Sequence, residues 1–106
     1  MTLENDGWYE THWPLSPRQT RAQKLAQRPA TLTGQVVAQL WDYVFHGDRI
    51  FAHLEQALRE RYPDIRFVHW REFGNIHSSD EARILGSLTQ RFKELGVTAA
   101  ITGMAC

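Results

Sequence analysis

The hydrophobic and polar positions of this chain become regular only after Thr33 and Gly34. Residues 36–41 form a nearly continuous apolar run, which is typical of a parallel strand covered on both faces. A helix is predicted over residues 49–61, because its apolar side chains recur every three or four positions. The members of this stripe are Ile50, Phe51, Leu54, Ala57, Leu58 and Tyr62.

The same pattern then repeats toward the end of the chain. Residues 65–70 predict a second strand, and their mixed polarity favours an outer position in a sheet. A second helix is predicted over residues 80–95, and a third strand is predicted from Val97 into a turn at Gly103. The side chains of the second helix expected to face inward are Ile84, Leu85, Leu88, Phe92 and Leu95.

Residues at the expected helix ends have the types that often stabilise such ends. Asp48 is a plausible N-cap for the first helix. Ser78 and Glu81 have the spacing of a capping box before the second helix. Gly96 is predicted to end the second helix in a left-handed conformation.

This order of elements indicates an α/β fold. Strand, helix, strand, helix and strand at this spacing predict a three-stranded parallel β-α-β-α-β unit with right-handed crossovers. The first strand is expected between the second and third, which gives half of a doubly wound sheet of the Rossmann or flavodoxin-like type. The third strand would lie at an open edge, so we expect a second copy or another chain to cover it.

Residues 1–33 are predicted to form an irregular N-terminal arm, followed by an α/β domain over residues 34–106 that is incomplete at its C-terminus. The arm contains three prolines and three early aromatic residues, Trp8, Tyr9 and Trp13, and only Arg18 to Gln27 has the composition of a short polar helix. The tryptophans favour an arm that lies on another surface. The alternative is a frayed terminus.

Composition narrows the classes of function. A chain of 106 residues forms one small domain, and its net charge of zero gives no field that favours nucleic acid or an anionic membrane. The single cysteine cannot form an internal disulfide or a multi-cysteine zinc site, which suits a reducing cytoplasm. No signal peptide or membrane-spanning stretch is evident. We therefore expect a cytoplasmic protein that binds neither nucleic acid nor membrane.

Groups that can carry out chemistry follow each predicted strand. Because the carboxyl ends of parallel strands share one edge, carboxylate, imidazole and thiol groups are expected to meet there. A thiolate beside an imidazolium or a helix N-terminus is a better nucleophile. The candidate catalytic residues are Cys106, His46 and Asp42. The candidate residues for an unknown small-molecule substrate are Asp48, His77, Asn75 and Gly103.

Each candidate also has a purely structural interpretation. Cys106 could be an inert cysteine, Asp48 a helix cap, and His46 and His77 loop donors to backbone carbonyls. A mixed zinc site of Asp42, His46, His77 and Cys106 is conceivable, but these residues lack the usual local spacing of metal ligands. Neither Gly-x-Gly-x-x-Gly nor a P-loop is present. No metal or cofactor is therefore expected.

Four segments resemble the UGSC family of (seleno)proteins, and together they extend from residue 28 to residue 106. They are Arg28-Pro29-Ala30-Thr31-Leu32-Thr33-Gly34, Leu40-Trp41-Asp42-Tyr43-Val44-Phe45-His46-Gly47-Asp48, Phe73-Gly74-Asn75-Ile76-His77 and Ile101-Thr102-Gly103-Met104-Ala105-Cys106. The last segment is similar to the strand and turn that precede the family's signature. That signature is selenocysteine-Gly-Ser-Cys, with cysteine in place of selenocysteine in many members.

The resemblance implies thiol or selenol chemistry of a redox or nucleophilic kind, with an unknown substrate. Selenocysteine is encoded by UGA, so we expect this chain to be the N-terminal part of such a protein, interrupted at that codon before the signature. Cys106 would then be a neighbouring or resolving thiol. The alternative is a non-catalytic binding or structural subunit that pairs through its open sheet edge and aromatic arm.

Overall fold

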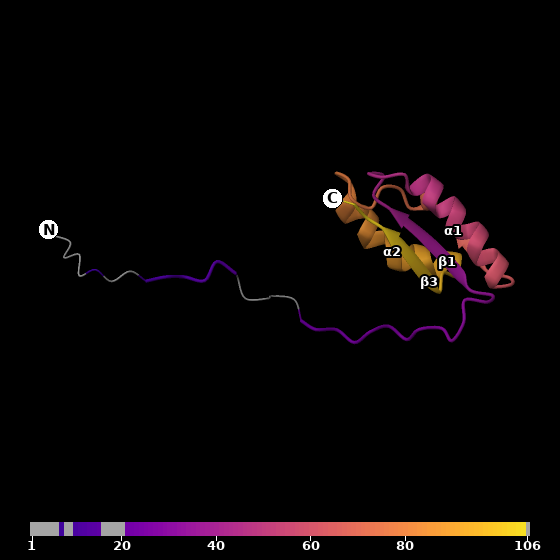
Figure 1. The fold of residues 1–106 in the computed structure, drawn as a ribbon, viewed down its shortest axis with the longest axis horizontal. Helices are drawn as coiled ribbons and strands as arrows, with labels where there is room; N and C mark the ends of the chain where they lie inside the picture. Colours follow the sequence, from indigo (N-terminus) through magenta and orange to yellow (C-terminus); the bar gives the residue numbers. More distant parts are fainter. Residues whose placement is uncertain (1–6, 8–9, 16–20, 106) are drawn as a thin grey trace.

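The computed structural model describes residue 7, residues 10–15 and residues 21–105. Residues 10–15 and 21–33 contain no helix or strand and extend away from the α/β unit (Figure 1). The predicted polar helix is wrong for residues 21–27, and its first residues lie outside the described part. Leu25 is the only large apolar side chain of residues 21–27 and is 83% exposed, so a helix there would have no apolar face to bury.

The described residues contain a three-stranded parallel sheet that confirms the predicted topology. Its strands are β1 (Val36–Trp41), β2 (Arg66–Val68) and β3 (Ala99–Gly103), in the order β2-β1-β3. Val37 pairs with Phe67 of β2, and Gln39 pairs with Ile101 of β3. The central strand is buried along nearly its whole length, as its apolar run predicted.

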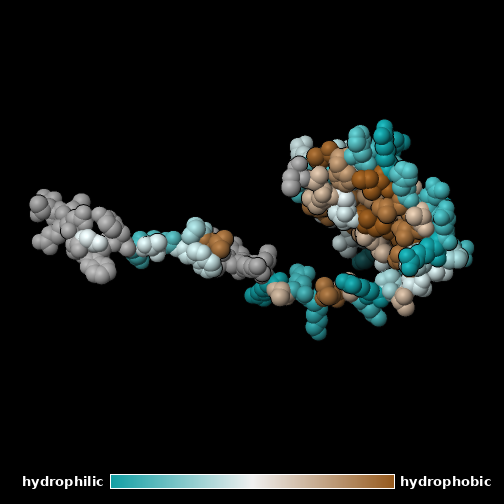
Figure 2. Space-filling view, in the orientation of Figure 1, coloured by the Kyte–Doolittle hydropathy of each residue, from teal (hydrophilic) through white to brown (hydrophobic). Residues whose placement is uncertain are grey.

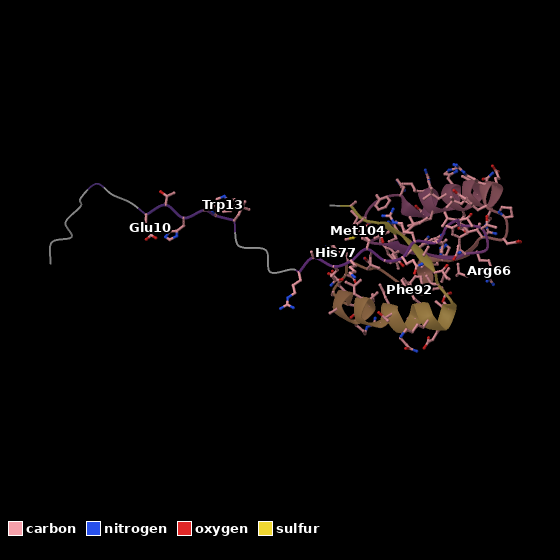
Figure 3. All side chains as sticks on the ribbon, turned by 90° about the horizontal axis from the view of Figure 1, so that it is seen from below. Glu10, Trp13, Arg66, His77, Phe92 and Met104 are labelled. Atoms are coloured by element: carbon pink, nitrogen blue, oxygen red, sulfur yellow. The ribbon has the colours of Figure 1, made fainter. Side chains whose placement is uncertain are left out.

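The helices α1 (Gly47–Arg61) and α2 (Glu81–Leu95) lie on opposite faces of the sheet (Figure 3). Alternate β1 side chains point to opposite faces, so each helix has its own core. Trp41 packs with Phe51 of α1 and with Trp70. Ala38 and Leu40 pack with Ile84 of α2 and its neighbours. This arrangement is the predicted doubly wound β-α-β-α-β unit.

The second strand is shorter than residues 65–70, because both of its predicted ends have other partners. The N–H of Ile65 donates to the carbonyl of Tyr62 in the preceding turn. Trp70 begins a 3-10 turn, η1 (Trp70–Glu72), and places its ring 4.7 Å from the Trp41 ring. A straight strand would not bring these two rings together.

Both predicted caps at the helix starts are wrong. His46 occupies the N-cap of α1, and Asp48 lies inside the first turn. Asp80 occupies the N-cap of α2, where the Ser78 hydroxyl accepts a hydrogen bond from the Asp80 N–H at 3.2 Å. The Glu81 carboxylate lies 3.2 Å from His77 Nδ1, so it does not close a capping box. Gly96 does end α2 with a left-handed φ of 69°.

The apolar stripes of the helices are only partly buried. Phe51 and Ile84 are buried, and Leu54, Leu58, Leu88 and Phe92 are half-buried, as predicted. Ile50, Leu85 and Leu95 were expected to face inward but are 47%, 45% and 37% exposed, and Ala57 is also exposed. A sheet of three strands is too narrow to cover the full width of either stripe.

The edge strand β3 contributes to an apolar surface. Ala100 and Thr102 are exposed, and Ile101 is half-buried. Apolar surface lies over the part of the domain where β3 and β1 appear in Figure 1 (Figure 2). Within the described ranges, no helix has both the length and the apolar character needed to cross a bilayer.

Candidate active-site rim

We use the term rim for three segments at the carboxyl end of the sheet: 42–46 after β1, 73–77 after η1, and 103–105 at the end of β3. His77 and Met104 lie at this end of the domain, and Arg66 lies at the other end (Figure 3). The rim therefore joins segments that are far apart in the sequence.

Asp42 is the link between the first and third segments of the rim. Its side chain is 1% exposed, and its Oδ2 accepts a hydrogen bond from the Ala105 N–H at 2.7 Å. Its Oδ1 accepts from the Val44 N–H at 3.2 Å, and the Asp42 N–H donates to the Gly103 carbonyl at 3.3 Å. This carboxylate fixes the backbone directly before Cys106, while Cys106 itself lies outside the described residues.

Asn75 ties the second segment to the same strand end. Asn75 forms a parallel bridge with Trp41, and the Ile76 N–H donates to the Trp41 carbonyl at 3.2 Å. The Asn75 side-chain oxygen accepts from the His77 N–H at 2.9 Å. The Asn75 side chain therefore stabilises the backbone conformation of its own loop.

The candidates His46, Asp48 and His77 are exposed, and each has a polar neighbour close by in the sequence. His46 Nδ1 is 3.9 Å from Asp48 Oδ1, and His77 Nδ1 is 3.2 Å from Glu81. Among the described residues, none of these side chains forms a hydrogen bond or an ion pair with Asp42. The structure therefore brings Asp42, Asn75 and Gly103 together, and it leaves the two imidazoles toward solvent.

Two glycines are required by aromatic side chains next to the rim. A Cβ on Gly103 would lie 2.8 Å from the Phe45 ring, and a Cβ on Gly47 would lie 2.5 Å from Trp41 Nε1. Gly103 was predicted as a substrate-binding residue, which stays a prediction, and in the structure its lack of a side chain allows close packing against Phe45. The loop between β1 and α1 therefore packs against the end of β3 through Phe45 and Gly103.

Sequence reasoning missed an aromatic cluster formed by Trp41, Tyr43, Phe45 and Trp70. The Tyr43 ring is 4.7 Å from Trp41 and 5.2 Å from Trp70, and Tyr43 has a left-handed φ of 63°. Such a backbone costs about 1–2 kcal/mol for a non-glycine residue. The aromatic residues at positions 41, 43 and 45 were the signal from which this cluster could have been predicted. The signal was missed because these residues lie at and beyond the end of a strand, where the sequence has no helical or strand period.

The comparison with protein families matches the UGSC family over residues 10–106. The chain belongs to the UGSC family. The match begins within the N-terminal arm, and so it includes more of the chain than the four segments recognised from residue 28 onward. The comparison with curated proteins found no match, and the comparison with solved structures found none either.

In this UGSC-family chain, the described residues contain no group of three or more histidine, cysteine or acidic side chains that could hold a metal ion. A hollow lies at the opposite end of the sheet, lined by Gln27, Arg28, Pro29, Gln35 and Thr98. Its lining contains no carboxylate, imidazole or thiol. The rim therefore remains the candidate site.

Proposed function

We propose that the rim carries thiol- or selenol-based redox or nucleophilic chemistry on a small molecule. The observation that supports this most directly is the 2.7 Å hydrogen bond from the Ala105 N–H to Asp42. A nucleophile must be held in a defined geometry to react efficiently. Asp42 gives that geometry to the backbone from which Cys106, and any signature residues after it, would extend.

Asp42 is best understood as a positioning residue in this proposal. Both of its carboxylate oxygens already accept backbone N–H groups, so it is poorly placed to take a proton from a substrate. His46 and His77 are exposed at the same end of the domain and remain candidates for proton transfer. We retain Asp48 and Asn75 as candidate substrate contacts.

Reactivity of Cys106 tests the chemistry independently. We expect iodoacetamide to alkylate Cys106 at lower pH than it alkylates N-acetylcysteine measured in parallel. An ordinary thiol ionises at about pH 8.5, whereas an activated thiol forms its reactive thiolate at lower pH. Replacing Asp42 with alanine should slow this reaction by releasing the segment. An alkylation profile identical to that of N-acetylcysteine would count against an activated site.

A second candidate function is a non-catalytic subunit that pairs with another copy through β3. The exposed Ala100 and Thr102 on an edge strand favour it, as does Trp13, which is 79% exposed in the arm. An open, apolar edge is prone to pair with another chain. Cytoplasmic location and the division into an arm and an α/β domain also remain predictions.

A further inference from the structure

Three exposed apolar side chains lie together on the rim. Tyr43, Val44 and Met104 are 42%, 57% and 58% exposed. The two oxygens of the Asp42 carboxylate accept hydrogen bonds from the Val44 N–H at 3.2 Å and from the Ala105 N–H at 2.7 Å. One carboxylate therefore holds segments 43–44 and 104–105 side by side, at the end of the domain where Met104 lies (Figure 3). We call these three exposed side chains the rim patch.

The Tyr43 ring is kept at the surface by a backbone conformation that is unfavourable for tyrosine. Its φ of 63° suits glycine, which has no Cβ to clash with the backbone. The ring packs 4.7 Å from the Trp41 ring and 5.2 Å from the Trp70 ring, and both of these are buried. Strained residues of this kind are concentrated at ligand-binding sites. An aromatic ring that is held half-exposed in this way is therefore suited to contact a ligand.

The rim patch presents no formal charge to a ligand. Residues 43–45 and 103–105 have no charged side chain. The Asp42 carboxylate between them is 1% exposed, and both of its oxygens already accept backbone N–H groups. A charged ligand group would lose hydration on these apolar side chains and gain no partner there. The patch therefore favours an uncharged group.

The charged side chains that border the rim patch do not change this preference. His46 Nδ1 lies 3.9 Å from Asp48 Oδ1. The Arg71 guanidinium lies over the Trp70 ring, 5.0 Å from its centre. One carboxylate beside one guanidinium and one imidazole attracts neither anions nor cations strongly.

We propose that the rim patch binds the uncharged, apolar part of a small-molecule substrate, which contacts the Tyr43 ring, Val44 and Met104. An aromatic face and a polarisable thioether both pack well on such a group. The patch lies at the carboxyl end of an open parallel sheet, where this class of fold binds its ligands. The inference deepens the proposed function by naming the substrate class, and it rests on that function only for the identity of the bound molecule as substrate.

The test is a titration of the chain, labelled with ¹⁵N and with ¹³C in the methionine methyl groups, followed by NMR at constant ionic strength. Benzyl alcohol is the uncharged probe, and benzoate and benzylamine carry the same ring with a negative or a positive charge. We expect saturable shifts of the Tyr43 and Val44 amides and of the Met104 methyl group with benzyl alcohol. Binding of both charged probes should be weaker by about threefold or more.

Leu85 is the internal control, because it is 45% exposed on α2, away from the rim. Equal shifts at Leu85 and at the rim patch would show that the probe binds any apolar surface, and this would overturn the proposal. Tighter binding of benzoate or benzylamine than of benzyl alcohol would overturn the assignment to an uncharged group.

Two pairs of variants sharpen the result. Y43G removes the ring and the backbone strain, and it should weaken benzyl alcohol binding about three- to tenfold, whereas Y43F keeps the ring and should bind as the parent does. M104Q makes an exposed position of the patch polar and should weaken binding about two- to fivefold. L85Q is its matched control on α2 and should leave binding unchanged. Unchanged binding in M104Q would contradict the site even if Y43G failed to fold.

A second copy of the chain is the other possible occupant of the rim patch. In that case the Tyr43 and Val44 amides would shift with protein concentration in the absence of any probe, and M104Q would abolish this dependence. That result would overturn the proposal. Because binding requires no reactive sulfur, saturable binding of benzyl alcohol together with ordinary alkylation of Cys106 would reject the proposed chemistry and keep the binding site.

Discussion

Asp42 shows how one side chain can hold two distant segments of this protein together. Its hydrogen bond to the Ala105 N–H spans 63 positions of the sequence. Because the carboxylate is nearly fully buried, the cost of its desolvation is offset by the backbone N–H groups that it accepts. Loss of these contacts should therefore affect both stability and the order of the segment after β3.

We expect D42A to lower the free energy of unfolding by about 3 kcal/mol, because hydrogen bonds to a charged group contribute about 1.5–3 kcal/mol each. D42N should cost less, since its remaining carbonyl oxygen still accepts one N–H. Urea denaturation measures stability, and hydrogen exchange at the Ala105 amide measures local order. The exposed change E60Q is the matched control. Unaltered exchange at Ala105 in D42A would show that the carboxylate does not hold this segment.

Gly103 gives a second prediction at the residue scale. G103A should destabilise the domain by about 1–3 kcal/mol, because the new methyl group would press on the Phe45 ring. The double variant G103A/F45L should recover part of this loss by removing the ring edge. G86A, with no atoms within 4 Å of its added methyl group, should be neutral or stabilising by up to about 1 kcal/mol. Thermal unfolding followed by circular dichroism distinguishes these cases. A G103A variant as stable as the parent would refute the close contact.

At the scale of elements, α2 shows which part of an apolar stripe a narrow sheet can bury. Ile84 packs against Ala38, Leu40 and Phe73, whereas the next residue, Leu85, is 45% exposed. The sequence pattern treated these two residues as equivalent members of one face. The structure separates them because the sheet beneath α2 has only three strands in the described chain.

The neighbouring pair tests this orientation of α2 directly. I84A should destabilise the domain by about 2–4 kcal/mol, because it leaves a cavity in the core. L85A should change the free energy of unfolding by less than about 1 kcal/mol, since its side chain remains largely in water. Both values come from urea denaturation. Equal losses would mean that a partner or another part of the chain covers Leu85.

At the scale of the whole molecule, the open edge of the sheet at β3 has the largest effect on whether the protein associates with another chain. Charged residues on an edge strand oppose pairing with another strand, yet β3 has none. If a second copy covers β3, the protein should associate in a concentration-dependent manner. The exposed positions Ala100 and Thr102 allow this to be tested without altering the core.

We expect the parent chain to elute from gel filtration at a larger size as its concentration rises, and the A100K/T102K variant to remain monomeric. A82K/T89K, which adds the same two charges at exposed positions of α2, is the control and should behave like the parent. Hydrogen exchange of the β3 amides provides a second measurement. A monomeric parent with well-protected β3 amides would argue against pairing through this edge.

The sequence by itself determined the order of the elements, the parallel topology and the central position of β1. These follow from local periods of apolar residues and from the handedness of parallel connections, which need no knowledge of distant contacts. The family followed from the segments around Asp42, Asn75 and Gly103. The length of the second strand was predicted wrongly, because Trp70 packs against Trp41, a residue distant in the sequence. Both N-cap predictions were also wrong, since the helices begin after His46 and Asp80.

Only the tertiary structure showed which rim residues are buried and which hydrogen bonds they form. Asp42 was predicted as a catalytic group, but its hydrogen bonds to Val44 and Ala105 support a positioning role. The unpaired indole N–H of Trp41 became visible only when α1 was placed against it. Burial and hydrogen bonding depend on residues that are remote in the sequence, and the chain brings them together only when the sheet and both helices have packed.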